Sequence, residues 1–129
     1  MRMPGAQSAR KVMMRIPSDG TLFEMAVDLV CDAELASYEM VMSRSRYAEL
    51  VQVRRLVSGM LSHRFGWSQH RIAKQWGQDH TSVGHQLQQI TDTEMETIES
   101  LTEDFIQLIR DNQAEIIARV NEVRNRNAV

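Results

Sequence analysis

The stretch Trp67–Ile90, WSQHRIAKQWGQDHTSVGHQLQQI, determines the fold that we expect for this chain. Ser68 is a good N-cap residue, and Ile72 and Trp76 follow it four residues apart, on one face of a helix. Gly77 then supplies the permissive backbone that a tight turn requires. The pattern predicts a short helix that ends in a turn.

A second helix is expected directly after this turn, over about residues 79–90, with Asp79 as its cap. Its apolar residues recur at the spacing of one helical stripe, at Val83, Leu87 and Ile90. The other side chains are short, polar and mixed in donor and acceptor character: His80, Thr81, Ser82, His85 and Gln88. Such side chains suit a helix in the major groove of DNA, so a helix-turn-helix is predicted. Any two-helix corner of a small helical domain would share the periodicity.

The run GQDHTSVGHQLQQI, residues 77–90, resembles the signature of the C-terminal DNA-binding domain of the bacterial replication initiator DnaA. That signature reads Gly-Arg-Asp-His-Ser/Thr-Thr-Val, followed by His-Ala and a basic pair. The matching positions are Asp79, His80, Thr81, Val83 and His85, with Ser82 where the family usually has Thr. TEDFIQLIR, residues 102–110, resembles the end of that domain. The resemblance covers roughly residues 22–112 and implies a Trp-repressor-like helix-turn-helix.

The sequence departs from this pattern at three basic positions and in the turn. Gln78 replaces an arginine, Gln88 and Gln89 replace the basic pair, and one glycine of the usual turn is missing. Each neutralised phosphate contributes about 0.9 to the salt dependence of binding to duplex DNA. We therefore expect weaker and less salt-dependent DNA binding than in the initiator.

The resemblance also assigns residues to the DNA interface. Those expected at the DNA backbone are Arg44, Arg46, Arg54, Arg71 and Lys74. Thr81, Ser82 and His80 are expected to read base edges, with Asp79 and Gln78 assisting at the start of the helix, and His85 is expected at the DNA interface on the same helix. Arg44 and Arg46 correspond to a basic loop that enters the minor groove, although they could simply keep a loop hydrated. Arg54 would hold a phosphate or form a structural salt bridge.

Charge is segregated along the chain, although the net charge is only −2. Residues 43–90 hold seven cations, two acids and all four histidines. Residues 21–42 hold five acids and no cation, and residues 91–129 hold nine acids and four arginines. Positive charge is thus concentrated on the candidate DNA-binding unit, as expected for a nucleic-acid site.

Length and composition predict one small domain, because 129 residues with 43% apolar content can form a modest core. The helical spacing of its apolar residues and the resemblance make the expected fold all-α. The single Cys31 excludes an internal disulfide and is expected to be a core residue. The sequence shows neither the roughly 18 to 20 apolar residues of a membrane span nor a signal-peptide pattern. We expect a cytoplasmic protein associated with the bacterial nucleoid.

Three parts are expected: a flexible basic arm at 1–20, the DNA-binding domain at 21–112, and a helical extension at 113–129. The arm would be a linker or would touch phosphates. Outside the motif, hydrophobic spacing predicts helices at about residues 22–31, 34–42, 47–65 and 94–124. Gly59, in the third of these, would allow a close helix crossing.

The long C-terminal helix continues its apolar spacing beyond the resemblance, through Ile116, Ile117, Val120 and Val123. It would be about 45 Å long at about 1.5 Å per residue, more than a small domain can cover. It would either break near Asp111 and Asn112 and fold back, or end in a partner-binding surface. A homodimer is the simplest form of such a surface.

An enzyme is not expected, and neither is a cofactor or a small-molecule substrate. His80 and His85 lie five residues apart, which does not place them on one helical face, and a single cysteine argues against a zinc site. The sequence contains no nucleophile elbow, no pair of tuned acids and no P-loop. ATP hydrolysis by the initiator belongs to a domain outside the resemblance.

The function that these features favour is sequence-specific binding of double-stranded DNA, in control of replication initiation or transcription, in a bacterial or phage-encoded protein. One alternative is an interaction module that retains the fold and binds a replication factor through the C-terminal helix. Another is a phage terminase-type small subunit, in which a helix-turn-helix is joined to an oligomerising helix.

Overall fold

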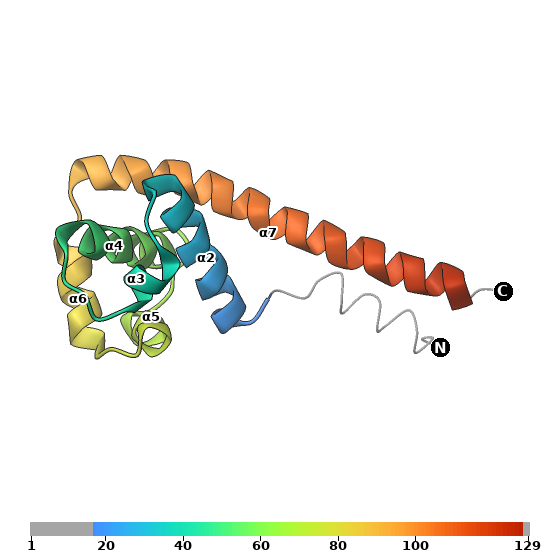
Figure 1. The fold of residues 1–129 in the computed structure, drawn as a ribbon, viewed down its shortest axis with the longest axis horizontal. Coiled ribbons are helices and arrows are strands. Elements are labelled where there is room, and N and C mark those ends of the chain that lie inside the picture. The colour runs from blue at the N-terminus through green and yellow to red at the C-terminus, as the bar shows by residue number, and fades with distance from the viewer. Residues whose placement is uncertain (1–16, 128–129) are drawn as a thin grey trace. The chain divides into compact units, whose positions relative to one another are not determined.

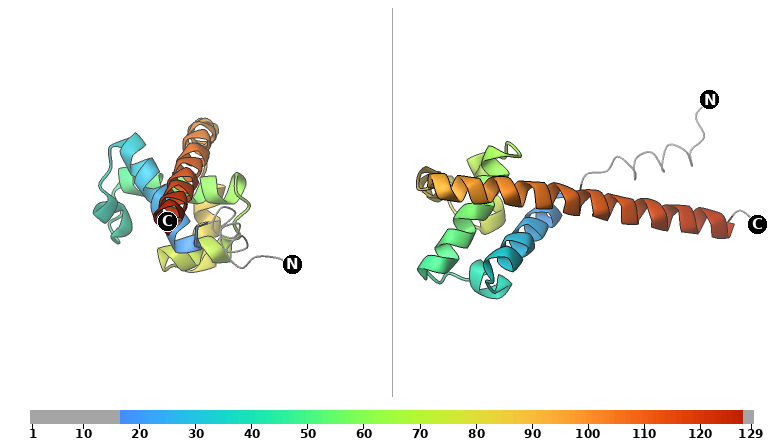
Figure 2. Two further views of the ribbon diagram at one scale, coloured as in Figure 1. Left: turned by 90° about the vertical axis from the view of Figure 1, so that its right-hand side faces the viewer. Right: turned by 90° about the horizontal axis from the view of Figure 1, so that it is seen from above.

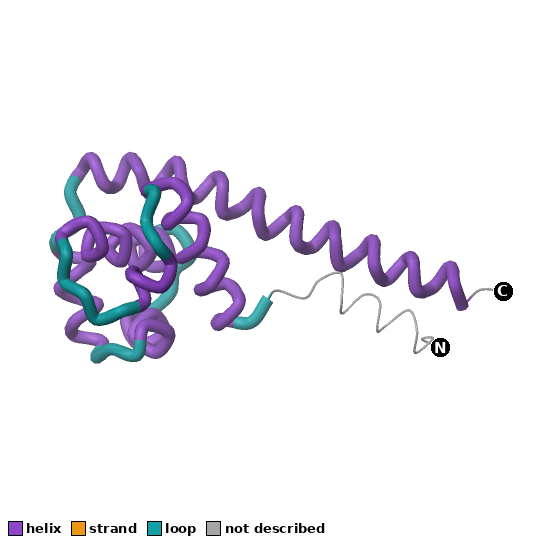
Figure 3. Tube along the Cα trace, in the orientation of Figure 1, coloured by secondary structure: helices purple, strands orange, loops and turns teal. Residues whose placement is uncertain are grey.

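The computed structural model describes residues 17–127, and this part of the chain forms six α-helices and no strand (Figures 1 and 3). The predicted all-α class is therefore confirmed. One compact unit comprises Ser18–Phe105, and a second unit contains residues 106–127. The predicted basic arm falls mostly on residues 1–16, which lie outside the described part. No helix within residues 17–127 has the length and apolar character needed to cross a membrane.

Helix α2 (Asp19–Glu34) extends beyond both predicted ends. It begins after Ser18, whose hydroxyl accepts a hydrogen bond from the backbone N–H of Thr21. It ends at Glu34, and the residue that follows, Leu35, takes a left-handed conformation with φ of 56°. The polar residues after Cys31 interrupt the hydrophobic spacing, but none of them breaks a helix.

Helix α3 (Tyr38–Met42) has only five residues, because the segment before it belongs to α2 and its turn. Helix α4 (Ala48–His63) follows and forms the centre of the core. Helix α2 packs against α4, and the right-hand view of Figure 2 shows the two helices side by side. A Cβ atom at Gly59 would lie 2.6 Å from Ile98 Cδ1 and 2.7 Å from Ile90 Cδ1, so this glycine does allow close packing.

Helices α5 (Gln69–Trp76) and α6 (His80–Gln88) are joined by a three-residue turn and pack closely on each other. The hydroxyl of Ser68 caps α5 by accepting from the N–H of Arg71. Gly77 ends α5 with φ of 69°, a left-handed conformation that glycine adopts without steric cost. Both roles agree with the sequence-based prediction.

Helix α7 (Asp92–Asn127) has 36 residues and passes through Asp111 and Asn112, so the predicted alternative of a break there is wrong. At its start, Thr91 Oγ1 accepts from the N–H of Glu94, and Glu94 Oε1 accepts from the N–H of Thr91. This reciprocal pair is a capping box, which fixes where the helix begins. The buried apolar residues of its first part are Ile98, Leu101 and Phe105.

Candidate nucleic-acid interface

The first turn of α6 presents the side chains that the sequence predicts to face DNA bases. Those of His80, Thr81 and Ser82 are exposed, as is Asp79 just before the helix. Val83, the next residue, is fully buried. Because one apolar residue anchors this turn, its polar side chains point to solvent.

Asp79 organises two of these side chains. Thr81 Oγ1 donates a hydrogen bond to Asp79 Oδ2 at 3.0 Å, and His80 Nδ1 lies 2.9 Å from Asp79 Oδ1. The hydrogen bonds from Thr81 first, and the neighbouring His80 to a smaller extent, hold the pKa of Asp79 below its usual range. Asp79 occupies the N-cap position but makes no side-chain capping bond. Since the Thr81 hydroxyl donates to Asp79, its lone pairs remain available to accept a hydrogen bond.

His80 is held on its other side by His70 of α5. The two imidazole rings stack with centroids 4.1 Å apart and planes 24° apart. Gln69, beside His70, closes in on α6: a Cβ atom at Gly84 would lie 3.0 Å from Gln69 Oε1. The sequence reading assigned no role to Gln69 or His70, because contacts between two helices depend on their crossing geometry.

A chain of polar contacts joins α4, α5 and α6 behind the exposed face. Trp76 Nε1 donates to Ser58 Oγ at 2.9 Å, and Ser58 Oγ donates to Gln86 Oε1 at 3.1 Å. Gln86 Nε2 in turn reaches Gln78 Oε1 at 3.5 Å. The orientation of α6 is therefore fixed by polar contacts as well as by Val83. The signal in the sequence was Ser58, a hydroxyl within an otherwise apolar run.

Arg54 is buried under the loop between α3 and α4, with 8% of its surface exposed. Its guanidinium donates to four backbone carbonyls, those of Met40, Val41, Ser43 and Ser45, at 2.7 to 3.3 Å. Burial lowers its pKa. The geometry supports a structural role, although the partners are carbonyls of α3 and of the loop, and not an acid as in the predicted salt bridge. Direct contact of Arg54 with phosphate remains a prediction.

Arg44 and Arg46, on this same loop, are exposed. They line a hollow of about 520 Å³ together with Arg54, with Trp76 at the end of α5, and with the turn residues Gly77 and Gln78. No acidic side chain lines it. The two loop arginines and the turn before α6 therefore border one positively charged recess, which the sequence could not show because these segments are some thirty residues apart.

The other predicted cations lie on α5. Arg71 forms a two-pronged ion pair with Asp19, at 2.7 and 2.8 Å, and its guanidinium lies 4.0 Å above the Trp67 ring. The hydrogen bond from Arg71 lowers the pKa of Asp19. Lys74 is exposed on the same helix, and His85 is exposed on α6. The structure thus leaves Lys74 more accessible to a phosphate than Arg71.

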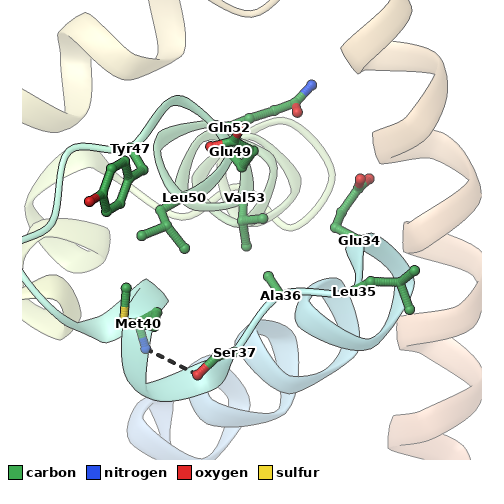
Figure 4. A pocket seen from close by; sticks show the side chains of 10 residues that line it. All are labelled: Glu34, Leu35, Ala36, Ser37, Met40, Tyr47, Glu49, Leu50, Gln52 and Val53. Carbon is green, nitrogen blue, oxygen red and sulfur yellow. Dashed lines mark hydrogen bonds between the residues drawn. The ribbon is translucent and has the colours of Figure 1, made fainter.

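A second hollow, of about 440 Å³, lies between the end of α2, α3 and the start of α4 (Figure 4). Ala36, Leu50 and Val53 point into it, and Glu34 and Glu49 stand at its rim (Figure 4). Leu35 beside it is 95% exposed. This hollow is apolar with an acidic rim, so it does not suit DNA.

Across the described residues, no three His, Cys, Asp or Glu side chains approach closely enough to hold a metal ion. Cys31 is buried, as expected of a core residue. No protein-family model matches the sequence, and no curated protein or solved structure matches it.

Proposed function

We propose that this protein binds double-stranded DNA in a sequence-specific manner, with α5, its turn and α6 as a helix-turn-helix. The observation that carries the proposal is the exposed polar first turn of α6 beside the acid-free arginine recess. In this arrangement α6 enters the major groove, while Arg44 and Arg46 reach the adjacent backbone or minor groove. The resemblance of residues 77–90 to the DnaA motif further supports it.

Within this interface, we assign base reading to Thr81, Ser82 and His80. Asp79 accepts from a cytosine amino group or holds Thr81 and His80 in place. Lys74, Arg44 and Arg46 supply charge at the phosphates, with Arg71 joining them if its pair with Asp19 opens. The biological role would be control of replication initiation or transcription by a bacterial or phage protein that acts on the nucleoid in the cytoplasm.

The test is selection from a pool of random duplex DNA, followed by affinity measurements on the enriched sequence at several salt concentrations. Thr81→Val should weaken binding to that sequence by roughly ten- to a hundredfold, because one base contact is lost. Ser100→Ala, a substitution at an exposed position of α7, is the matched control and should leave affinity unchanged.

The loop arginines should affect binding differently. Replacing both Arg44 and Arg46 with Ala should weaken binding to all sequences and lower the salt slope by about 1.8, if each holds one phosphate of duplex DNA. If no motif is enriched and neither set of substitutions changes DNA affinity while the variants remain folded, the protein is not a DNA reader.

One observation favours a second candidate function, protein binding at a site other than the C-terminal helix. The apolar hollow of Figure 4 is bordered by Leu35, whose 95% exposure and left-handed backbone are both unfavourable for leucine. Such a residue often serves a binding site. If Leu35→Gly removed the protein's biological activity and Thr81→Val did not, this second function would replace the first.

A further inference from the structure

The outer part of α7 carries a row of side chains at heptad spacing. We call this row the seam; it consists of Ile106, Ile109, Gln113, Ile116, Val120 and Val123. Five of the six are β-branched apolar residues, the kind that packs well between two helices, and a single polar residue often fixes the register of such a contact. None is fully buried, and Val123 is 53% exposed. The seam is thus suited to a partner helix.

Charges are sorted around the seam. The positions directly beside it, e and g of the heptad, hold four arginines, one asparagine, one isoleucine and no acid: Arg110, Asn112, Ile117, Arg119, Arg124 and Arg126. The acids of this segment lie at positions further from the seam: Asp111, Glu115 and Glu122. Arg119 pairs with Glu115 at 2.5 Å, and Arg126 pairs with Glu122, but these are exposed contacts along one helix and are weak. Both edges of the seam are therefore basic.

This arrangement disfavours a second copy as the partner. In a parallel pair, position g faces position e of the other helix, so Arg119 of each copy would face Arg124 of the other. In an antiparallel pair g faces g and e faces e, and neither set contains an acid. Neither orientation brings opposite charges together. In a homodimer, like-charge repulsion along the edges would therefore oppose the favourable apolar contact along the seam.

A membrane surface also fits poorly. Outside the seam the only large apolar residues of 106–126 are Leu108 and Ile117, the segment contains no aromatic side chain, and three acids lie on the remaining surface of the helix. Helices that lie on anionic membranes have broad apolar faces and basic polar faces. A protein helix with matching acidic edges is the better complement.

We propose that the seam binds an amphipathic helix of another protein, with apolar residues at its a and d positions and glutamate or aspartate at e and g. The proposal follows from the sorting of charge on α7 and does not depend on DNA binding. It replaces the homodimer as the partner of the C-terminal helix.

The first experiment measures binding of the full-length protein to two synthetic helical peptides with the same apolar core. One peptide carries Glu at every e and g position and the other carries Lys. The Glu peptide should bind at least about tenfold more tightly, and added salt should reduce the difference. Val120→Asp should abolish this binding. Ala118→Asp, at an exposed position away from the seam, is the matched control and should have no effect.

The second experiment reverses the edges. A variant with Arg119→Glu and Arg124→Glu should prefer the Lys peptide and should form mixed dimers with the unaltered protein, detected by sedimentation. The proposal would be overturned if the unaltered protein bound both peptides with equal affinity, or if it bound neither of them. Self-association of the unaltered protein as strong as that of the mixture would mean that a second copy is the occupant. Binding to phosphatidylglycerol vesicles that Val120→Asp removes would mean a membrane.

Discussion

Replacing Arg54 tests whether this side chain builds the arginine loop or holds DNA. Arg54→Met keeps most of the side-chain volume but removes the donors to two carbonyls of α3 and two of the loop that follows it. Hydrogen bonds from a charged group contribute about 1.5 to 3 kcal/mol each. When Arg54 is removed, the part-buried carbonyls can form hydrogen bonds with water instead, but the buried carbonyl of Val41 beneath the loop cannot. We therefore expect a net loss of about 3 kcal/mol in the free energy of unfolding.

Urea unfolding followed by circular dichroism measures this loss. With a slope of about 1.5 kcal/mol per M for a small domain, the midpoint should fall by about 2 M. Arg54→Lys keeps the charge without the planar fork and should recover only part of the stability. The matched control, Arg46→Met on the exposed loop, should change stability by less than about 0.5 kcal/mol.

The result that would refute the structural role is specific. Arg54→Met would then cost less than about 1 kcal/mol in stability while lowering the salt slope of DNA binding by about 0.9, the contribution of one phosphate contact. That combination would mean that the loop does not depend on the guanidinium and that the guanidinium binds phosphate directly.

Burial of Glu94 acts to raise its pKa, but hydrogen bonds from Arg55 and from the Thr91 N–H outweigh it, so the net pKa is lowered. A carboxylate whose pKa is lower in the folded state stabilises the protein fully above its unfolded-state pKa of about 4.3, and this stability is lost as the pH falls through its folded-state pKa. Glu94→Gln should therefore reduce the loss of stability at acid pH, which urea unfolding at several pH values would measure. Gly77→Ala should lower the free energy of unfolding by about 1 kcal/mol, because φ is 69° at this position. Leu35→Gly should raise stability slightly, because glycine adopts the left-handed conformation more easily than leucine. Thermal unfolding in which both variants shift the melting temperature in the same direction would contradict this account. Trp76→Phe should lower the free energy of unfolding by about 1 kcal/mol, because it removes the donor to Ser58. Ser58→Ala should cost a similar amount, and in a double-mutant cycle the two losses should not add.

The sequence predicted the features that are local in the chain. Ser68 and Gly77 delimit α5 because capping and a left-handed turn depend on one or two residues. Exposure of Thr81 and burial of Val83 follow from helical spacing alone. The end of α2 was missed because a left-handed Leu35, not a glycine, stops that helix.

Contacts between distant segments could not be predicted in the same way. The partner of Arg71 is Asp19, fifty-two residues away, and the stack of His70 on His80 depends on how α5 crosses α6. The role of Arg54 could be narrowed to two possibilities from the sequence, but its carbonyl partners required the path of the loop. The identity of a side chain limits which kinds of partner it can have, and the three-dimensional packing determines which partner it contacts.

The contacts of Arg54 also bear on how this protein can change during evolution. Each of its four partners is a main-chain carbonyl, a group that every amino acid provides. The loop can therefore exchange the exposed side chains at Arg44 and Arg46 without losing the bonds that Arg54 makes to its main chain. Substitutions at Arg44 and Arg46 would change the groups that the loop can bind but would leave its backbone path intact. Retention of Arg54 alone would thus allow the binding preference of the loop to diversify.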